Sequence, residues 1–140
     1  MSEGSVFLSL KSAAATSGGC GYQPVDELHE LKCSADVIIS AAGATSMDSF
    51  EVDHLKNLRS NGHGSKGILF PKAFLGETFG VSTFFALAAG FDMIVNHAEY
   101  PQMPVHPDIV MLPAAISGVA TVLVSGADRT GAFTSALLTR

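Results

Sequence analysis

The sequence has few charged residues and few cysteines. Asp, Glu, Lys and Arg make up 15% of its 140 residues, and their balance gives a net charge of −5. A nucleic-acid-binding surface needs a cluster of basic residues, so this class of partner is not expected. The two cysteines, Cys20 and Cys33, are far apart and have no CxxC spacing. A disulfide framework is therefore not expected, and the composition is consistent with a reducing cytoplasm.

The N-terminal residues, Met-Ser-Glu-Gly, lack the basic segment of a secretory signal peptide. Two apolar stretches have to be considered as membrane spans. Residues 79–95 contain Asp92 and fall short of the ~20 residues that a spanning helix needs. Residues 110–127 are interrupted by Pro113 and Gly118. Both stretches are therefore predicted to be core segments, and no membrane partner is expected.

Apolar residues are abundant, at 47% of the chain, which predicts that much of it is buried. The length suits a single domain covering residues 1–140. Alternation and helical spacing predict the elements along the chain. Strands are expected at residues 6–10, 36–40, 67–70, 121–125 and 134–139, and helices at 25–33, 46–59 and 79–96. This order predicts an α/β fold with a mostly parallel five-stranded sheet, one antiparallel strand and helices on both faces.

A basic residue, two glycines and a polar residue gather at one strand-to-helix corner. Lys72, Gly76, Glu77 and Gly80 follow the expected strand 67–70 and precede or open the long apolar helix. Helix N-termini at such corners direct backbone N–H groups towards a ligand in α/β folds. This corner is therefore the most informative segment of the chain for function.

The helix expected at residues 79–96 is apolar in almost every direction around its axis. A helix of this kind should be buried on all sides. A single α/β layer of 140 residues would leave one side of it in water. The pattern therefore predicts that another chain, or a further part of the protein, covers the outer side, and an oligomer is expected.

The corner resembles the second-histidine block of β-ketoacyl-carrier-protein synthases, of the 3-oxoacyl-carrier-protein synthase II type or of the related chain-length factors. That block has a lysine, three residues, Gly-His, two residues and a glycine. Lys72, Gly76 and Gly80 match it, and Glu77 stands at the histidine position. Residues 6–140 as a whole resemble the C-terminal half of this thiolase-like fold. In that fold, two similar halves stack their sheets around a shared layer of helices.

Two further segments carry the resemblance. The family's strand that ends in His-Gly-Thr-Gly-Thr is matched with Ser40 at the histidine and Gly43 at the second glycine, and Asp48 and Glu51 fit its acidic pair. In the family's closing glycine-rich loop, only Gly131 is retained. The family's nucleophilic cysteine lies in the N-terminal half, which this sequence does not include.

The resemblance implies acyl transfer and decarboxylative condensation that form a 3-oxoacyl thioester, in fatty acid or polyketide biosynthesis. Acyl and malonyl groups would be carried on the phosphopantetheine of acyl carrier protein, with no bound cofactor and no metal. It assigns catalytic positions to Lys72, Glu77 and Ser40. It also assigns substrate-binding positions in the glycine-rich segments, at Gly43, Gly76, Gly80 and Gly131.

The substitutions at the histidine positions leave alternatives open. A Glu77 carboxylate only accepts hydrogen bonds, so it could assist an enolate only if burial kept it protonated. Lys72 and Glu77 could instead form an ion pair that fixes the corner. The chain alone is not expected to be active. The rival to a synthase half is a non-catalytic subunit that completes a partner's active site, and a free-standing binding protein is disfavoured by the apolar helix.

The remaining titratable and thiol side chains favour structural roles. Cys33 is expected in the core and Cys20 in a loop. His54 and His63 are expected to be solvated. The pairs His97–Glu99 and His106–Asp108 could in principle meet at a metal, but both lie in a proline-rich loop and no metal site is expected.

Overall fold

The computed structural model describes residues 9–16, 34–41, 49–76, 81–103, 106–109, 115–127 and 133–140, and every structural statement below concerns these residues. Its five strands are β1 (Ser9–Thr16), β2 (Val37–Ser40), β3 (Gly67–Leu69), β4 (Thr121–Ala127) and β5 (Phe133–Thr139). Its three helices are α1 (Ser49–Ser60), α2 (Lys72–Leu75) and α3 (Ser82–Val95). The predicted α/β class is confirmed.

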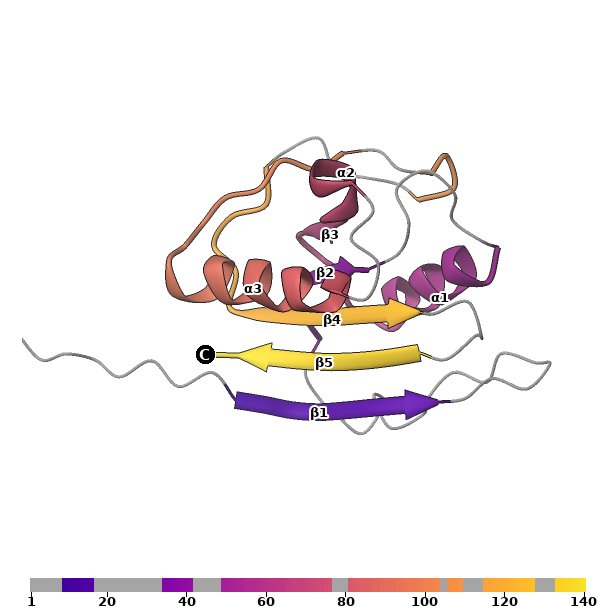
Figure 1. The fold of residues 1–140 in the computed structure, drawn as a ribbon, viewed down its shortest axis with the longest axis horizontal. Helices are drawn as coiled ribbons and strands as arrows, with labels where there is room; N and C mark the ends of the chain where they lie inside the picture. Colours follow the sequence, from indigo (N-terminus) through magenta and orange to yellow (C-terminus); the bar gives the residue numbers. More distant parts are fainter. Residues whose placement is uncertain are drawn as a thin grey trace, which may run out of the picture.

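The strands form one mixed sheet in the order β1-β5-β4-β2-β3. β2 runs parallel to both of its neighbours, β3 and β4. β5 runs antiparallel to β4 on one side and to β1 on the other. β5 is therefore the one described strand that points against the rest, as its arrow shows in Figure 1.

Side chains alternate along the central strands, so each strand sends apolar residues to both faces of the sheet. A helix covers each of these faces. Ile38, Leu123 and Leu137 pack in one cluster with the α1 residues Val52, Leu55 and Leu58. The neighbouring strand residues Val37, Ile39, Val122, Val124 and Leu138 pack in a second cluster with the α3 residues Ala86, Met93 and Ile94. α1 and α3 therefore cover opposite faces. This accounts for the nearly continuous apolar run in β2, whose four residues are all buried.

A glycine sets how closely α3 approaches the sheet. A Cβ atom at Gly90 would lie 2.9 Å from Leu138 Cδ1 and 3.2 Å from Val122 Cγ1. Gly90 therefore occupies a helix interior, where glycine is normally unfavourable, because it lets the helix backbone rest directly on β4 and β5.

The observed elements differ from the predicted ones mainly at the corner after β3. A short helix, α2, stands in the corner between β3 and α3, where no helix or strand was predicted. Gly76, the residue that follows α2, has a φ of 75°, which only glycine adopts easily and which ends the helix. α1 agrees with the predicted helix 46–59 over its described part and ends one residue later, and residues 46–48 lie outside the described residues. β1 extends to Thr16, further than residues 6–10 suggested, and the expected helix at 25–33 lies outside the described residues.

The expectation that His54 and His63 are solvated is wrong. Both side chains are buried. The Nδ1 atom of His63 accepts a hydrogen bond of 3.1 Å from the backbone N–H of Ala35. His54 lies four residues before Leu58 on α1, and this spacing places it on the helix face that meets the sheet.

Candidate functional site

Ser40 and Lys72, two of the predicted catalytic residues, lie at the carboxyl edge of the described sheet. β2 ends at Ser40, and β3 is followed by Pro71 and Lys72 at the start of α2. β2 and β3 are parallel neighbours, so their carboxyl ends lie at the same edge, where α/β sheets place their ligands. Ser40 is 4% exposed and Lys72 is partly buried. Ser40 and Lys72 thus lie at the same edge of the sheet, at the end of β2 and three residues after the end of β3.

The other assigned residues lie outside the part of the chain that the structure describes. Gly43, Glu77, Gly80 and Gly131 belong to this group. Gly76 is described and closes α2 by donating its backbone N–H to the carbonyl oxygen of Lys72, at 3.0 Å. The assignment of Glu77 to one catalytic site with Lys72 and Ser40, and an ion pair between Glu77 and Lys72, therefore stay predictions.

Three serines stand in a row across the sheet at this edge. Ser40 of β2 is opposite Ser125 of β4, which in turn is opposite Ser135 of β5. All three are buried. By the alternation along their strands they share the face of Ile38, Leu123 and Leu137, which is the α1 face. Sequence reasoning singled out Ser40 alone, because the register that aligns three separate strands is not visible in one sequence.

α1 contributes an imidazole to this serine row. Nε2 of His54 lies 2.8 Å from Oγ of Ser125, and His54 is 8% exposed. Burial lowers the pKa of His54 from its usual 6.5 to about 4, because a charged imidazolium loses its hydration there. His54 is therefore neutral near pH 7. The cluster can donate and accept hydrogen bonds, but it brings no positive charge to a developing enolate.

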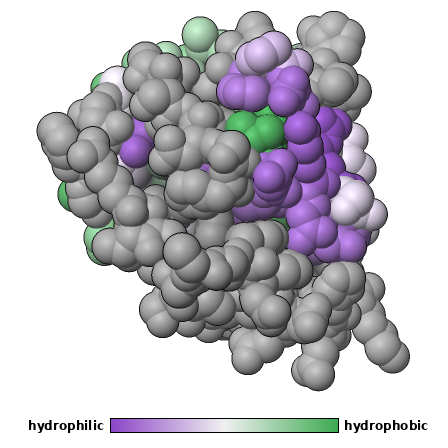
Figure 2. Space-filling view, turned by 90° about the vertical axis from the view of Figure 1, so that its right-hand side faces the viewer, coloured by the Kyte–Doolittle hydropathy of each residue, from purple (hydrophilic) through white to green (hydrophobic). Residues whose placement is uncertain are grey.

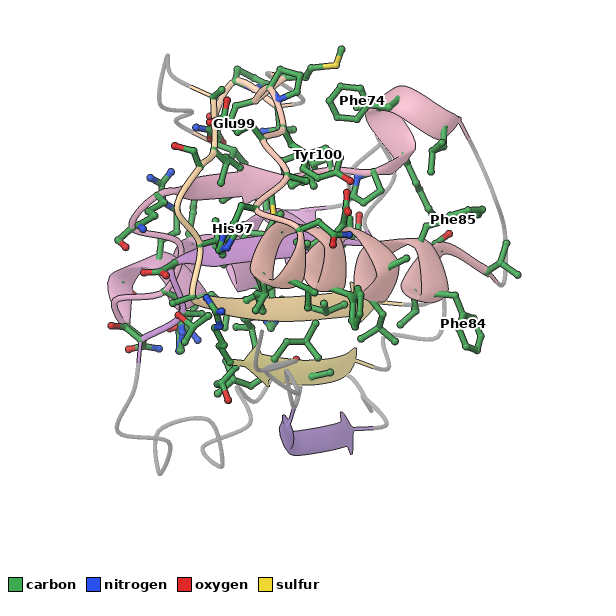
Figure 3. All side chains as sticks on the ribbon, turned by 90° about the vertical axis from the view of Figure 1, so that its left-hand side faces the viewer. Phe74, Phe84, Phe85, His97, Glu99 and Tyr100 are labelled. Atoms are coloured by element: carbon green, nitrogen blue, oxygen red, sulfur yellow. The ribbon has the colours of Figure 1, made fainter. Side chains whose placement is uncertain are left out.

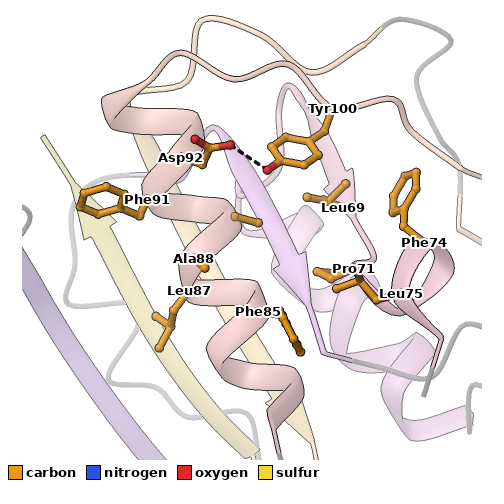
Figure 4. A pocket seen from close by; sticks show the side chains of 11 residues that line it. Leu69, Pro71, Phe74, Leu75, Phe85, Leu87, Ala88, Phe91, Asp92 and Tyr100 are labelled. Atoms are coloured by element: carbon orange, nitrogen blue, oxygen red, sulfur yellow. Dashed lines mark hydrogen bonds between the residues drawn. The ribbon is translucent and has the colours of Figure 1, made fainter. Parts of the chain in front are cut away.

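A second feature is an apolar groove between α2 and α3. It encloses about 720 Å³, within the size range of ligand sites. Figure 4 shows side chains of α2 on one side, side chains of α3 on the other and Leu69 of β3 at the back. Phe74, Leu75, Phe85 and Phe91 line the groove and are all exposed.

One end of the groove is polar. The hydroxyl of Tyr100 donates a hydrogen bond of 2.9 Å to Oδ2 of Asp92, and the side-chain amide of Asn96 donates one of 2.8 Å to Oδ1. The hydrogen bonds from Asn96 and Tyr100 lower the pKa of Asp92. Burial and the neighbouring Asp92 raise the pKa of Tyr100. The pair therefore presents a carboxylate and a protonated phenol near pH 7.

The surface over α1 has a different character. Asp53, Lys56, Ser60 and Asn61 are exposed there, and Figure 2, seen from the side of α1, shows mainly hydrophilic atoms among the described residues. Figure 3 shows the opposite side, where Phe84 and Phe85 extend from the N-terminal part of α3 and Phe74 from α2. The exposed phenylalanines of the described chain thus gather on the α3 side of the sheet.

The described residues contain no group of three or more His, Cys, Asp and Glu side chains arranged to hold a metal ion. His97 and Glu99, which were considered for such a role, are both exposed in the segment after α3 (Figure 3). Among the helices of the described residues, none has both the length and the hydropathy that crossing a bilayer requires.

No model of a known protein family matches this sequence, and neither a search of curated proteins nor one of solved structures finds a match.

Proposed function

We propose that this chain is a thiolase-like half-domain that acts in a 3-oxoacyl-[acyl-carrier-protein] synthase. The observation that carries this proposal is α3, which packs one side against the sheet and leaves phenylalanines on its other side exposed. The family resemblance implies two halves stacked around a shared layer of helices, and one half taken alone presents such a helix. The sheet supports the same proposal, because among the strands of the described residues only β5 runs against the others.

The proposed activity is acyl transfer followed by decarboxylative condensation. Acyl and malonyl groups arrive on the phosphopantetheine of acyl carrier protein, and a second half with a nucleophilic cysteine holds the acyl group as a thioester. Lys72, Glu77 and Ser40 are the residues of this chain that we assign to the reaction. Lys72 supplies positive charge, and Ser40 can donate one hydrogen bond to a thioester carbonyl. Gly43, Gly76, Gly80 and Gly131 are assigned to substrate binding.

A second candidate function is that of a non-catalytic subunit which completes the active site of a partner synthase. The burial of Ser40 within an uncharged row of hydroxyl groups favours this candidate, as does the neutral state of His54 beside Ser125. Neither group replaces the charge that a family histidine can carry.

Reconstitution tests the proposal and separates the two candidates. The chain is combined with a synthase half that carries the nucleophilic cysteine, and condensation of acyl and malonyl carrier-protein thioesters is measured. If the chain is catalytic, Lys72→Ala lowers kcat at least tenfold. Lys56→Ala, which removes an exposed lysine of α1, leaves kcat unchanged.

If the chain is a structural subunit, the partner's activity requires the chain but tolerates both lysine substitutions. A chain that neither binds a synthase half nor supports condensation contradicts both candidates.

The isolated chain is expected to show only background condensation. It has no thiol at the family's nucleophile position and neither family histidine, so it cannot form the acyl-enzyme or stabilise the enolate in the family's manner. Turnover well above background that survives both Cys20→Ala and Cys33→Ala would contradict this reading of the sequence.

A further inference from the structure

One side of α3 carries a regular stripe of exposed residues. Val81, Phe84, Ala88, Phe91 and Val95 follow one another at spacings of three, four, three and four residues. Such spacing keeps all five on one side of the helix and is the spacing of a helix–helix seam. Phe84 is 71% exposed, Ala88 is also exposed and Val95 is half-buried. We call these five residues the outer stripe.

The outer stripe reads the same in both directions: valine, phenylalanine, alanine, phenylalanine, valine. A two-fold symmetric interface needs a surface that is complementary to itself. When two copies of α3 lie antiparallel with Ala88 at the axis, Phe84 of each meets Phe91 of the other. The small Ala88 lets the helices approach closely between the aromatic pairs.

We infer that the outer stripe binds a second copy of this chain, so that two α3 helices pack antiparallel about a two-fold axis near Ala88. The inference goes beyond the proposed function: a second copy covers the outer stripe of the isolated chain, on the surface where the proposed synthase half would otherwise pack. The groove beside α3 adjoins the stripe at Ala88 and Phe91, so the partner's Phe84 enters at its mouth.

The exposed phenylalanines supply about half of the area that each partner of a stable dimer buries. Phe74, Phe84, Phe85 and Phe91 are 45%, 71%, 42% and 46% exposed, which at ~150–250 Å² for each phenylalanine amounts to roughly 400 Å². Exposed Leu75 and Val81 adjoin them and extend the patch beyond the few hundred Å² of an ordinary monomer surface. A standard interface buries about 800 Å² on each partner, and flanking residues can supply the remainder.

The charges agree with the antiparallel arrangement. Asp92 is the one charged residue within α3, and its pKa is lowered by Asn96 and Tyr100, so it is ionised near pH 7. In the antiparallel pair, the two Asp92 positions lie about 12 Å apart along the axis, at a rise of 1.5 Å per residue. A parallel pair would set the two carboxylates side by side, where they repel.

Sedimentation equilibrium of the purified chain tests the self-association. The expected result is a mass twice that of the monomer at micromolar concentration. Ala88→Arg, which puts a charge at the axis, should weaken association at least 100-fold. Ser60→Arg adds the same charge at an exposed position on α1, on the opposite face of the sheet, and should leave the mass unchanged.

Cysteine cross-linking tests the geometry, in a chain where Cys20 and Cys33 are replaced by serine. Ala88→Cys should form an 88–88 disulfide in high yield under mild oxidation, because symmetry brings these positions together. Phe84→Cys alone should cross-link poorly, whereas a mixture of Phe84→Cys and Phe91→Cys chains should form the mixed dimer.

A folded chain that stays monomeric at about 100 µM overturns the inference, as does a dimer that Ala88→Arg leaves intact. If that monomer still binds a cysteine-bearing synthase half and supports condensation, only the second-copy inference fails. If the symmetric dimer forms but supports no condensation with any synthase half, the inference stands and the proposed synthase function fails.

Discussion

At the scale of single residues, the most consequential contact is that between His54 and Ser125. It joins α1 to the carboxyl end of β4 through buried groups. A sequence pattern could have located His54 on the inner face of α1, since Leu55 and Leu58 mark that face. No pattern could have paired it with Ser125, because 71 residues separate the two and only the sheet register brings them together.

His54 makes stability depend on pH. Its folded pKa is about 4, below its usual 6.5, so the unfolded chain binds the proton more readily. The contribution of neutral His54 to the free energy of unfolding is therefore fully present above pH 6.5 and is lost as the pH falls towards 4. At about 1.36 kcal/mol for each pH unit, the loss is up to about 3 kcal/mol. Urea denaturation between pH 7 and 4 measures this loss.

The matched variants assign that slope to one side chain. His54→Gln should flatten the pH dependence, because glutamine does not titrate. His97→Asn removes an exposed histidine with a φ of 55°, a conformation that asparagine tolerates, and should retain the slope. A slope that persists in His54→Gln would assign the proton uptake to another group.

A second prediction concerns Asp36, just before β2. Its carboxylate accepts hydrogen bonds from the backbone N–H groups of Ala120 and Thr121, at 2.8 and 3.3 Å. The backbone N–H of Asp36 donates in return to the hydroxyl of Thr121, at 2.9 Å. Asp36→Ala leaves two backbone donors without this acceptor and should cost about 1–3 kcal/mol of unfolding free energy.

Thermal and urea unfolding of Asp36→Ala can be compared with Asp53→Ala, which removes an exposed carboxylate from α1. The control should change stability by less than ~0.5 kcal/mol. Equal losses in the two variants would mean that the Asp36 contacts add nothing beyond surface charge.

At the scale of elements, the contact of α3 with the sheet depends on Gly90. Gly90→Val would press a branched side chain against Leu138 and Val122, and it should lower the unfolding free energy by about 1–3 kcal/mol. Gly90→Ala should be milder, because the tip of Leu138 can move and alanine favours the helix. Urea denaturation of both variants measures this order, and a Gly90→Val chain as stable as the native one would show that α3 can lift from the sheet at no cost.

The elements also show what a single sequence can predict. β2, β3 and β4 were predictable because their residues form short apolar runs bounded by polar or small residues. α2 was not, since four helical residues ended by Gly76 give no periodic signal. The position of Ser40 and Lys72 at one edge of the sheet was predictable, because each lies at or just after the end of a predicted strand. The row of Ser40, Ser125 and Ser135 was not, because it depends on strand pairings that no local pattern encodes.

At the scale of the whole molecule, the apolar residues around α3 predicted a helix that is buried on all sides. In the structure, only one side of α3 is buried. The inner side of α3 is buried on the sheet, but its outer side exposes Phe84, Phe85 and Phe91. The apolar residues of α3 suit a buried helix, but this fold buries only the inner side of the helix. Burial of the outer side would need a partner. An exposed apolar patch of this kind predicts association, and aggregation when the partner is missing.

The pairing of β1 with β5 has a consequence for synthesis. Ser9 pairs with Thr139, so β1 can join the sheet only after β5 has been synthesised. During translation, every residue from Ser9 to Thr139 has to leave the ribosome before this ladder is complete. Contacts so distant in sequence slow folding, and until then β1 has an unpaired backbone that other chains can bind. This topology therefore leaves the backbone of β1 open to other chains for longer than a fold built from local hairpins would.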